Sequence, residues 1–372
     1  FCLCLALLSH AATAADKQPA TPTLSAARHL LLTGKYEEAS DAYLAMRESE
    51  PVAAAIGLAR CQASRGERVD ADATLLSAAE HSGAAELHAE RAALAFDRGD
   101  YDAARKYVER ALTTDRESLA ARWWQAELFR TAGELERAEA GYKWFVDYYN
   151  DHDEFSADEL RWVGLAAAQF ARWRRLSGQF SFFVNELYPD DLKLDADFWP
   201  AHYESGLLFL EKYNDPQALR ELKAALAINS NAAEVHAALA ALALHDYRLD
   251  EARRELDLAI EINPKLLAAH QLLTDLHLTN LEARDAIRVL EAAREVNAVD
   301  EETLGRLAAA YAVVDGISPD KKLSSRVATI IEEVDRRNPH AGTFYYALGA
   351  ALDLARRFPA AAHYYREAVA RM

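Results

Sequence analysis

The segments FWPAHYESGLLFLEKYNDPQALRELKAALAINSN (residues 198–231), AAEVHAALAALALHDYRLDEARRELDLAIEINPK (232–265) and LLAAHQLLTDLHLTNLEARDAIRVLEAAREVNAV (266–299) follow one another in the chain. At an offset of 34 residues, residues of the same kind occupy the same positions. The matching sets are His202, His236 and His270; Gly206, Ala240 and Thr274; Ala218, Ala252 and Ala286; Leu222, Leu256 and Leu290; Ala225, Ala259 and Ala293; and Asn229, Asn263 and Asn297. A fixed period of this length indicates a repeat architecture.

Small residues in each segment indicate where two helices of one hairpin pack closely. Gly206 with Ala218, and Ala240 with Ala252, leave space for the two helices to touch. Leu222 is then expected to fill the space between one hairpin and the next. A single hairpin of this kind cannot bury its own apolar face, so the hairpins must stack into a solenoid.

The three segments resemble the tetratricopeptide repeat (TPR) family, and looser units surround them. The Gly34-Lys35-Tyr36 turn, for example, is followed by Ala39 and Tyr43 at the same spacing. The resemblance implies an all-α fold, a right-handed α-solenoid of about ten helix-turn-helix units with an irregular aromatic-rich unit in the middle. The predicted organisation is units 1–4 in residues 24–150, a divergent unit 5 in 151–198, units 6–8 in 199–298, and units 9–10 in 301–372, with an insertion in unit 9 at 315–325.

The first 15 residues, FCLCLALLSHAATAA, carry no charge and end in small residues. The stretch is too short to span a bilayer, and Ala12-Thr13-Ala14 suits a signal-peptidase site. We therefore predict a signal peptide, truncated at its N-terminus, and an exported protein that is periplasmic or extracellular. No membrane span is expected after cleavage; a helix buried in the fold is the alternative interpretation.

The chain is acidic, with 42 Lys and Arg residues against 59 Asp and Glu residues and a formal net charge of −17. Nucleic-acid binding requires a basic surface, so this balance argues against nucleic acid as a partner. It argues equally against an anionic membrane surface.

Aromatic residues concentrate in the middle of the chain. All six Trp residues lie between Trp123 and Trp199, and the divergent unit adds several Phe residues. Aromatic residues at helical spacing usually form core, which predicts an irregular core where two stacks of repeats meet. The functional alternative is an aromatic pocket for an apolar or proline-rich peptide.

No catalytic motif stands out, and we expect no cofactor and no catalytic residue in this segment. His202, His236 and His270 occupy one equivalent position in successive hairpins, about 8–10 Å apart. Zinc ligands must each come within about 2.1 Å of one ion, so these histidines are interpreted as packing residues. His277 lies seven residues after His270, too far for direct shared ligation, and no metal site is predicted.

The TPR resemblance implies that a protein or peptide ligand binds along the concave face, which the first helix of each hairpin lines. By register, the predicted peptide-binding groove is formed by Tyr203, Leu207, Leu210, Glu211, His245, Gln271, Asp275 and Leu278. Alanines, leucines and acids replace the Lys, Asn and Arg that clamp chaperone tails in the family, which favours a hydrophobic or helical ligand. The predicted function is an exported interaction scaffold. The alternative is a non-catalytic arm of a larger enzyme, for example with a zinc-peptidase-like domain after Met372.

Overall fold

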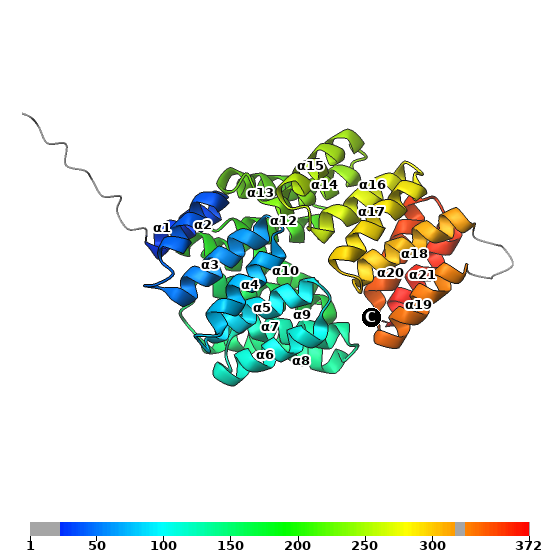
Figure 1. Cartoon of the computed structure of the whole chain (residues 1–372). Helices are drawn as coiled ribbons and strands as arrows, with labels where there is room; N and C mark the ends of the chain where they lie inside the picture. The colour runs from blue at the N-terminus through cyan, green and yellow to red at the C-terminus, as the bar shows by residue number, and fades with distance from the viewer. Residues whose placement is uncertain (1–22, 317–323, 372) are drawn as a thin grey trace, which may run out of the picture.

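A computed structural model describes residues 23–316 and 324–371 of the chain (Figure 1). Within these ranges the secondary structure is helical and no strand occurs. The prediction of an all-α helical repeat solenoid is confirmed. The predicted signal peptide at 1–15 lies outside the described residues, as do positions 317–323 of the predicted insertion.

The first part of the chain forms four helical hairpins, which we call the N-terminal hairpins. Each has a short turn between its two helices, and each second helix places buried alanines against the first. Their helices are α1 (Leu24–Leu32) and α2 (Tyr36–Ala45), α3 (Pro51–Ser64) and α4 (Arg68–Ala79), α5 (Ala85–Asp97) and α6 (Tyr101–Thr114), and α7 (Leu119–Thr131) and α8 (Leu135–Asp151).

The middle of the chain is irregular. Helix α9 (Ala157–Trp173) begins at a capping box, in which the side chains of Ser156 and Glu159 each accept from the other's backbone N–H. The segments η1 (Ser177–Gln179), α10 (Phe180–Phe182), η2 (Phe183–Leu187) and α11 (Tyr188–Leu194) follow. The η2 turn is π-helical and ends two residues before Pro189, which lacks the N–H that a regular α-helix would use there.

The rest of the chain forms five further hairpins, which we call the C-terminal hairpins. In the first of them, Leu222 fills the space over Gly206, where an added Cβ would lie 2.8 Å from its Cδ2. Leu222, Leu256 and Leu290 are fully buried, and each contributes about 1.5–3 kcal/mol through burial. The helices are α12 (Trp199–Glu211) and α13 (Asp215–Ile228), α14 (Ala233–His245) and α15 (Leu249–Ile262), α16 (Leu267–Thr279) and α17 (Ala283–Val296), α18 (Glu301–Asp315) and α19 (Ser325–Arg337), and α20 (Gly342–Leu354) and α21 (Phe358–Arg371). The division into domains made from the sequence stays a prediction.

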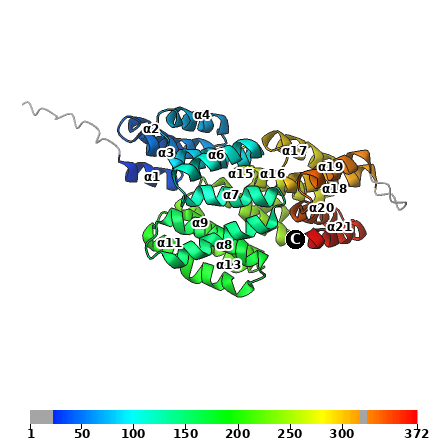
Figure 2. The ribbon, with the colours of Figure 1, turned by 90° about the horizontal axis from the view of Figure 1, so that it is seen from below.

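The solenoid winds back onto itself, so that later hairpins lie against the N-terminal hairpins (Figures 1 and 2). Four glycines, each in the turn after the first helix of an N-terminal hairpin, mark the contact; we call them the docked turns. Each has a φ between +73° and +79°, and each faces one asparagine that precedes a later hairpin. The pairs are Gly34 with Asn229, Gly66 with Asn263, Gly99 with Asn297 and Gly133 with Asn338.

Hydrogen bonds accompany these contacts. Asn229 donates from Nδ2 to the hydroxyl of Tyr36 (3.1 Å), and Asn231 donates to the carbonyl of Gly34 (3.0 Å). Asn263 donates to the carbonyl of Ala63 (3.3 Å) in the next docked turn. The C-terminal ends of α1, α3, α5 and α7 therefore meet the N-terminal ends of α14, α16, α18 and α20. This arrangement places the negative end of each first helix dipole against the positive end of another.

Candidate partner-binding surface

The predicted groove residues on α12 differ in how far they are exposed. Tyr203 and Leu207 are partly buried and pack on the apolar cluster that contains Leu222. Leu210 is also partly exposed, whereas Glu211 is exposed and accepts from Arg172 of α9 at 2.8 Å. This part of the surface is apolar along the helix and ion-paired at its end.

The predicted groove residues on α16 have partners within the chain. Gln271 is buried and donates to Asp300 (2.8 Å) and Thr303 (3.1 Å) of the neighbouring hairpin. Asp275 accepts two bonds from Arg306, at 3.0 and 3.1 Å. Leu278 has no exposed surface and belongs to the core cluster around α18 and α20. Of the predicted set, the side chains on α12 and α14 are therefore the more accessible ones.

His245, the predicted groove residue on α14, lies beside an exposed aromatic ring. It stacks on Tyr213, with ring centroids 5.6 Å apart, and Tyr213 belongs to the turn between α12 and α13. Tyr213, Tyr247 and Leu281 occupy the same turn position in three successive hairpins; we call them the turn ridge. Their exposed fractions are 79%, 74% and 55%. The ridge therefore presents one large apolar side chain per hairpin.

The turn ridge was not anticipated from the sequence, although a signal for it is present. Its residues have φ values of +54°, +55° and +64°, in the left-handed region that the docked turns occupy with glycine. For a residue with a bulky side chain, this left-handed conformation costs about 1–2 kcal/mol. The sequence signal is that this turn position holds glycine in the first four hairpins and a large residue, Tyr213, Tyr247, Leu281 or Arg356, in later ones.

The contact between the N-terminal and C-terminal hairpins is rich in carboxylates. A cavity of about 140 Å³ lies there, lined by Asp97, Tyr101 and Arg130 on one side and Asp300 and Glu301 on the other. Burial raises the pKa of Asp97, Asp300 and Glu301, and Arg130 partly opposes the rise at Glu301. Residues of the N-terminal and C-terminal hairpins thus enclose this cavity together.

Ion pairs also join α9 to other helices of the chain. Arg161 bonds to Glu204 at 3.4 Å, and burial raises the pKa of Glu204 despite this partner. Arg28 pairs with Asp158 (2.9 Å) and Asp195 (3.3 Å), which links α1 to the irregular middle. Arg161 and Arg28 therefore have carboxylate partners within the chain.

The aromatic residues of the middle region form core and border a cavity. Tyr142, Phe145, Phe183 and Tyr188 are buried in one cluster, with several Trp rings packed against it. A mostly apolar cavity of about 360 Å³ lies beside them, lined by side chains that include Phe170 and Phe183. Both the core interpretation and the pocket alternative from the sequence thus have a structural counterpart.

The three aligned histidines make hydrogen bonds to nearby parts of the chain. His202 bonds to Glu221 (2.8 Å), and His236 bonds to Glu255 (2.7 Å). His270 bonds to the carbonyl of Pro264 at 2.9 Å. Burial lowers the pKa of His236, but the bonds to Glu255 and to a backbone carbonyl outweigh it, so the pKa is raised.

Within residues 23–316 and 324–371, none of the helices combines the length and the apolar character that crossing a membrane requires.

Comparisons with known proteins bear on the type of repeat. Residues 90–144 match the family described as tetratricopeptide repeat. The chain is similar to a thermophilic TPR protein of Thermus thermophilus, with 25% identity and a TM-score of 0.40 over 50% of this chain and 95% of the other. It is also similar to a TPR protein of Parabacteroides merdae ATCC 43184, with 14% identity and a TM-score of 0.40 over 67% of this chain and 95% of that one.

A longer match reaches the APC/C hetero-tetramer Cut9–Hcn1, at 15% identity and a TM-score of 0.54. It covers 94% of this chain and 64% of the other, and it supports the fold. No curated protein sequence matches significantly.

Proposed function

From the premise that this chain is a tetratricopeptide repeat protein, we propose that it is an exported scaffold that binds a peptide or helix of a partner protein at its C-terminal hairpins. A TPR solenoid supports protein–protein interaction in general. The more specific parts of the proposal are export, the identity of the binding surface and the chemistry of the ligand.

The proposal rests on the contrast between the docked turns, which other residues of the chain cover, and the turn ridge, which is exposed. The docked turns are covered by asparagines of the chain itself. The turn ridge instead exposes two Tyr side chains and one Leu, next to His245 and the partly exposed Leu210. Exposed apolar side chains that recur along an edge are typical of protein-interaction surfaces.

The spacing of the ridge indicates the shape of the ligand. Neighbouring helices pack about 8–10 Å apart, and the ridge residues recur once per hairpin. Apolar side chains seven residues apart on a helix lie on one face about 10.5 Å apart. Those three residues apart on an extended polyproline II segment, which has three residues per turn, lie on one side about 9 Å apart. An amphipathic helix or an extended peptide with apolar side chains at that interval fits the ridge.

The charge of the surrounding surface indicates the flanking residues of the ligand. Asp215, Asp246 and Glu282 lie in or next to the ridge turns, together with Lys212 and Arg248, and the whole chain has a net charge of −17. We therefore propose a ligand whose apolar residues are flanked by Lys or Arg, because complementary charge increases the rate and specificity of association.

Site-specific photo-crosslinking tests the binding surface. A photoreactive phenylalanine replaces Tyr213 or Tyr247 in the full-length protein in its native cells, and the crosslinked species are identified by mass spectrometry. Val69 on α4 provides the matched control, because it is 78% exposed and lies on an N-terminal hairpin. The proposal requires one partner protein to be captured at both ridge positions and not at Val69; equal capture at all three positions contradicts it.

Export is proposed from residues 1–15 alone, and it has a separate test. Fusion of the leader and chain to a reporter that is active only outside the cytoplasm should give a signal, and deletion of residues 1–15 should abolish it. Nothing in the described residues favours the alternative of an arm of a larger enzyme, which stays a prediction, as does the absence of catalytic activity.

A further inference from the structure

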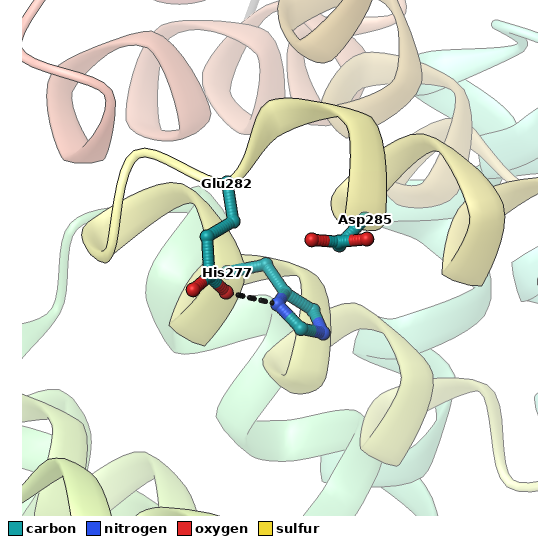
Figure 3. A group of neighbouring side chains, drawn as sticks. All are labelled: His277, Glu282 and Asp285. Atoms are coloured by element: carbon teal, nitrogen blue, oxygen red, sulfur yellow. Dashed lines mark hydrogen bonds and ion pairs between the residues drawn. The ribbon is translucent and has the colours of Figure 1, made fainter.

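Three potential metal ligands come together at the turn between α16 and α17 (Figure 3). His277 lies on the last part of α16, Glu282 is the residue that directly precedes α17, and Asp285 lies in the first turn of α17. Nδ1 of His277 is 2.7 Å from Oε2 of Glu282. One ligand atom from each of the three side chains lies within 4.8 Å of the other two.

The backbone fixes the relative positions of these residues. The N–H of Glu282 donates to the carbonyl of His277 at 2.8 Å, which closes the turn. The N–H of Asp285 donates to the carbonyl of Glu282 at 3.0 Å. Because the three residues belong to one hairpin, their arrangement does not depend on contacts with distant parts of the chain.

We propose that His277, Glu282 and Asp285 bind a divalent transition-metal ion, with Zn²⁺ as the preferred ion. One imidazole nitrogen and two carboxylate oxygens form a mixed N/O ligand set, which suits Zn²⁺ better than Ca²⁺ or Mg²⁺, whose sites use oxygen ligands. Tetrahedral zinc holds its ligands at about 2.0–2.2 Å, so ligand atoms lie roughly 3.3 Å apart. Binding therefore requires the His277–Glu282 pair to open from 2.7 Å and the group, whose atoms lie within 4.8 Å of one another, to adjust to that spacing by rotation of the three side chains.

Three protein ligands leave a fourth position for water or for a side chain of a partner. The site lies next to Leu281 of the turn ridge, so a bound ion is accessible from the same edge of the solenoid. The inference concerns metal binding by the isolated chain, and it does not depend on the proposed partner.

The equivalent positions of the neighbouring hairpins provide the reference. At 34 residues before the three ligands stand Ala243, Arg248 and Glu251, a set that lacks the histidine and places a cation next to the carboxylate. The ligand set is therefore a property of the α16–α17 hairpin and is not part of the repeat pattern.

Ion pairing without a metal is the competing explanation. Asp285 pairs with Arg288 one turn along α17, and His277 pairs with Glu282. These two pairs satisfy the charges separately and do not require Asp285 to act with His277. Metal binding instead requires all three side chains to act together, and that difference can be measured.

The test uses the untagged chain, stripped with a chelator and titrated with Zn²⁺ in competition with a chromophoric chelator. Native mass spectrometry gives the stoichiometry. We expect one Zn²⁺ per chain and an affinity that falls more than about ten-fold in each of His277→Ala, Glu282→Gln and Asp285→Asn. Ala at position 277 is the residue that the preceding hairpin carries, so the fold should tolerate it, and circular dichroism verifies this.

His245→Ala is the matched control, because His245 ends α14 in the preceding hairpin and also lies near a carboxylate, 3.9 Å from Asp215. Its affinity for Zn²⁺ should equal that of the unchanged chain, and Co²⁺ should give the visible absorption of a tetrahedral site that His277→Ala removes. Failure of the unchanged chain to bind Zn²⁺ overturns the proposal, as does binding that none of the three substitutions weakens, or that His245→Ala weakens equally.

Discussion

The docked turns and the turn ridge have the same backbone conformation and opposite surroundings. At the docked turns the residue is glycine, and an added Cβ at Gly66 or Gly133 would lie 2.7 or 2.6 Å from an asparagine oxygen. At the ridge, Tyr213 and Tyr247 have similar positive φ values and point into solvent. The left-handed turn alone therefore does not require glycine in this fold. Glycine is required where another part of the chain packs onto the turn.

Placing a tyrosine, as found in the turn ridge, into a docked turn should reduce the stability of the chain more than any other change proposed below. In Gly34→Tyr, the new Cβ overlaps Oδ1 of Asn229, and the ring has no space beside an asparagine that is fully buried. Together with the strain of the positive φ, we expect a loss of about 4 kcal/mol in the free energy of unfolding. Urea unfolding followed by circular dichroism measures it; a loss below about 1 kcal/mol would show that the contact does not constrain the turn.

The irregular middle that joins the two regions contains a second sensitive position, Asp191. Its side chain is fully buried, and its oxygens have no hydrogen-bond partner among the described residues. Burial raises its pKa to about 8; Arg161 opposes the rise, whereas Asp158, Asp190 and Glu204 add to it.

In the unfolded chain the carboxyl of Asp191 ionises near pH 4, so the folded state loses stability as the pH rises from about 4 to about 8. Asp191→Asn removes this loss. The free energy of unfolding of this variant, relative to that of the unchanged chain, should increase by roughly 1.4 kcal/mol per pH unit, or about 3 kcal/mol between pH 5 and pH 7. Urea unfolding at both pH values tests this, with Asp190→Asn as the control at a more accessible neighbour. An advantage that does not change with pH contradicts the assignment.

Removing an asparagine from the contact should have an intermediate effect. Asn229→Ala deletes the bond to Tyr36 and leaves the N–H of Asn231 without its 2.9 Å acceptor. We expect a loss of about 2 kcal/mol. Asn280→Ala, at the exposed end of α16, should change the stability by less than about 0.5 kcal/mol. Equal losses in the two variants would mean that the contact between the hairpins adds nothing.

The reciprocal exchange should have the smallest effect. Tyr213→Gly relieves about 1 kcal/mol of backbone strain in the folded state. The glycine also gives the unfolded chain more conformational freedom, which lowers the stability by a similar free energy. The free energy of unfolding should therefore change by less than about 0.5 kcal/mol, whereas photo-crosslinking of the partner at Tyr247 should decrease. A large destabilisation would identify Tyr213 as a structural residue and would weaken the case for the ridge as a binding surface.

The 34-residue period predicted the fold because each hairpin packs mainly on its sequence neighbours. Leu222, Leu256 and Leu290 were expected between hairpins, and all three are fully buried. The contact between the N-terminal and C-terminal hairpins was not predicted, because it joins residues about 200 positions apart, such as Asn263 and Ala63. The two sets of residues that make this contact are the glycines of the docked turns and the asparagines before the later hairpins. Each set alone is common in turns between helices, so neither indicated the contact.

The predicted groove illustrates what register alone can provide. It assigned Gln271 and Leu278 to an inner face without indicating that the following hairpin covers them. It also did not identify Tyr213 and Tyr247, because turn residues lie outside the helical pattern. The group around His277 was not predicted, because its three residues lie on both sides of a turn and do not follow the spacing of a known metal-binding motif.

The contact of asparagines with the docked turns changes how the array should unfold. A linear solenoid has only nearest-neighbour interfaces, so it can lose repeats from its ends one at a time. Here Gly34 contacts Asn229, and the loss of the first hairpin exposes the start of α14 as well. Each N-terminal hairpin thus contacts both its sequence neighbours and a hairpin from the C-terminal part of the chain. Hydrogen exchange should then report one cooperative transition across the four N-terminal hairpins and the hairpins they contact, in place of gradual fraying from the N-terminal end.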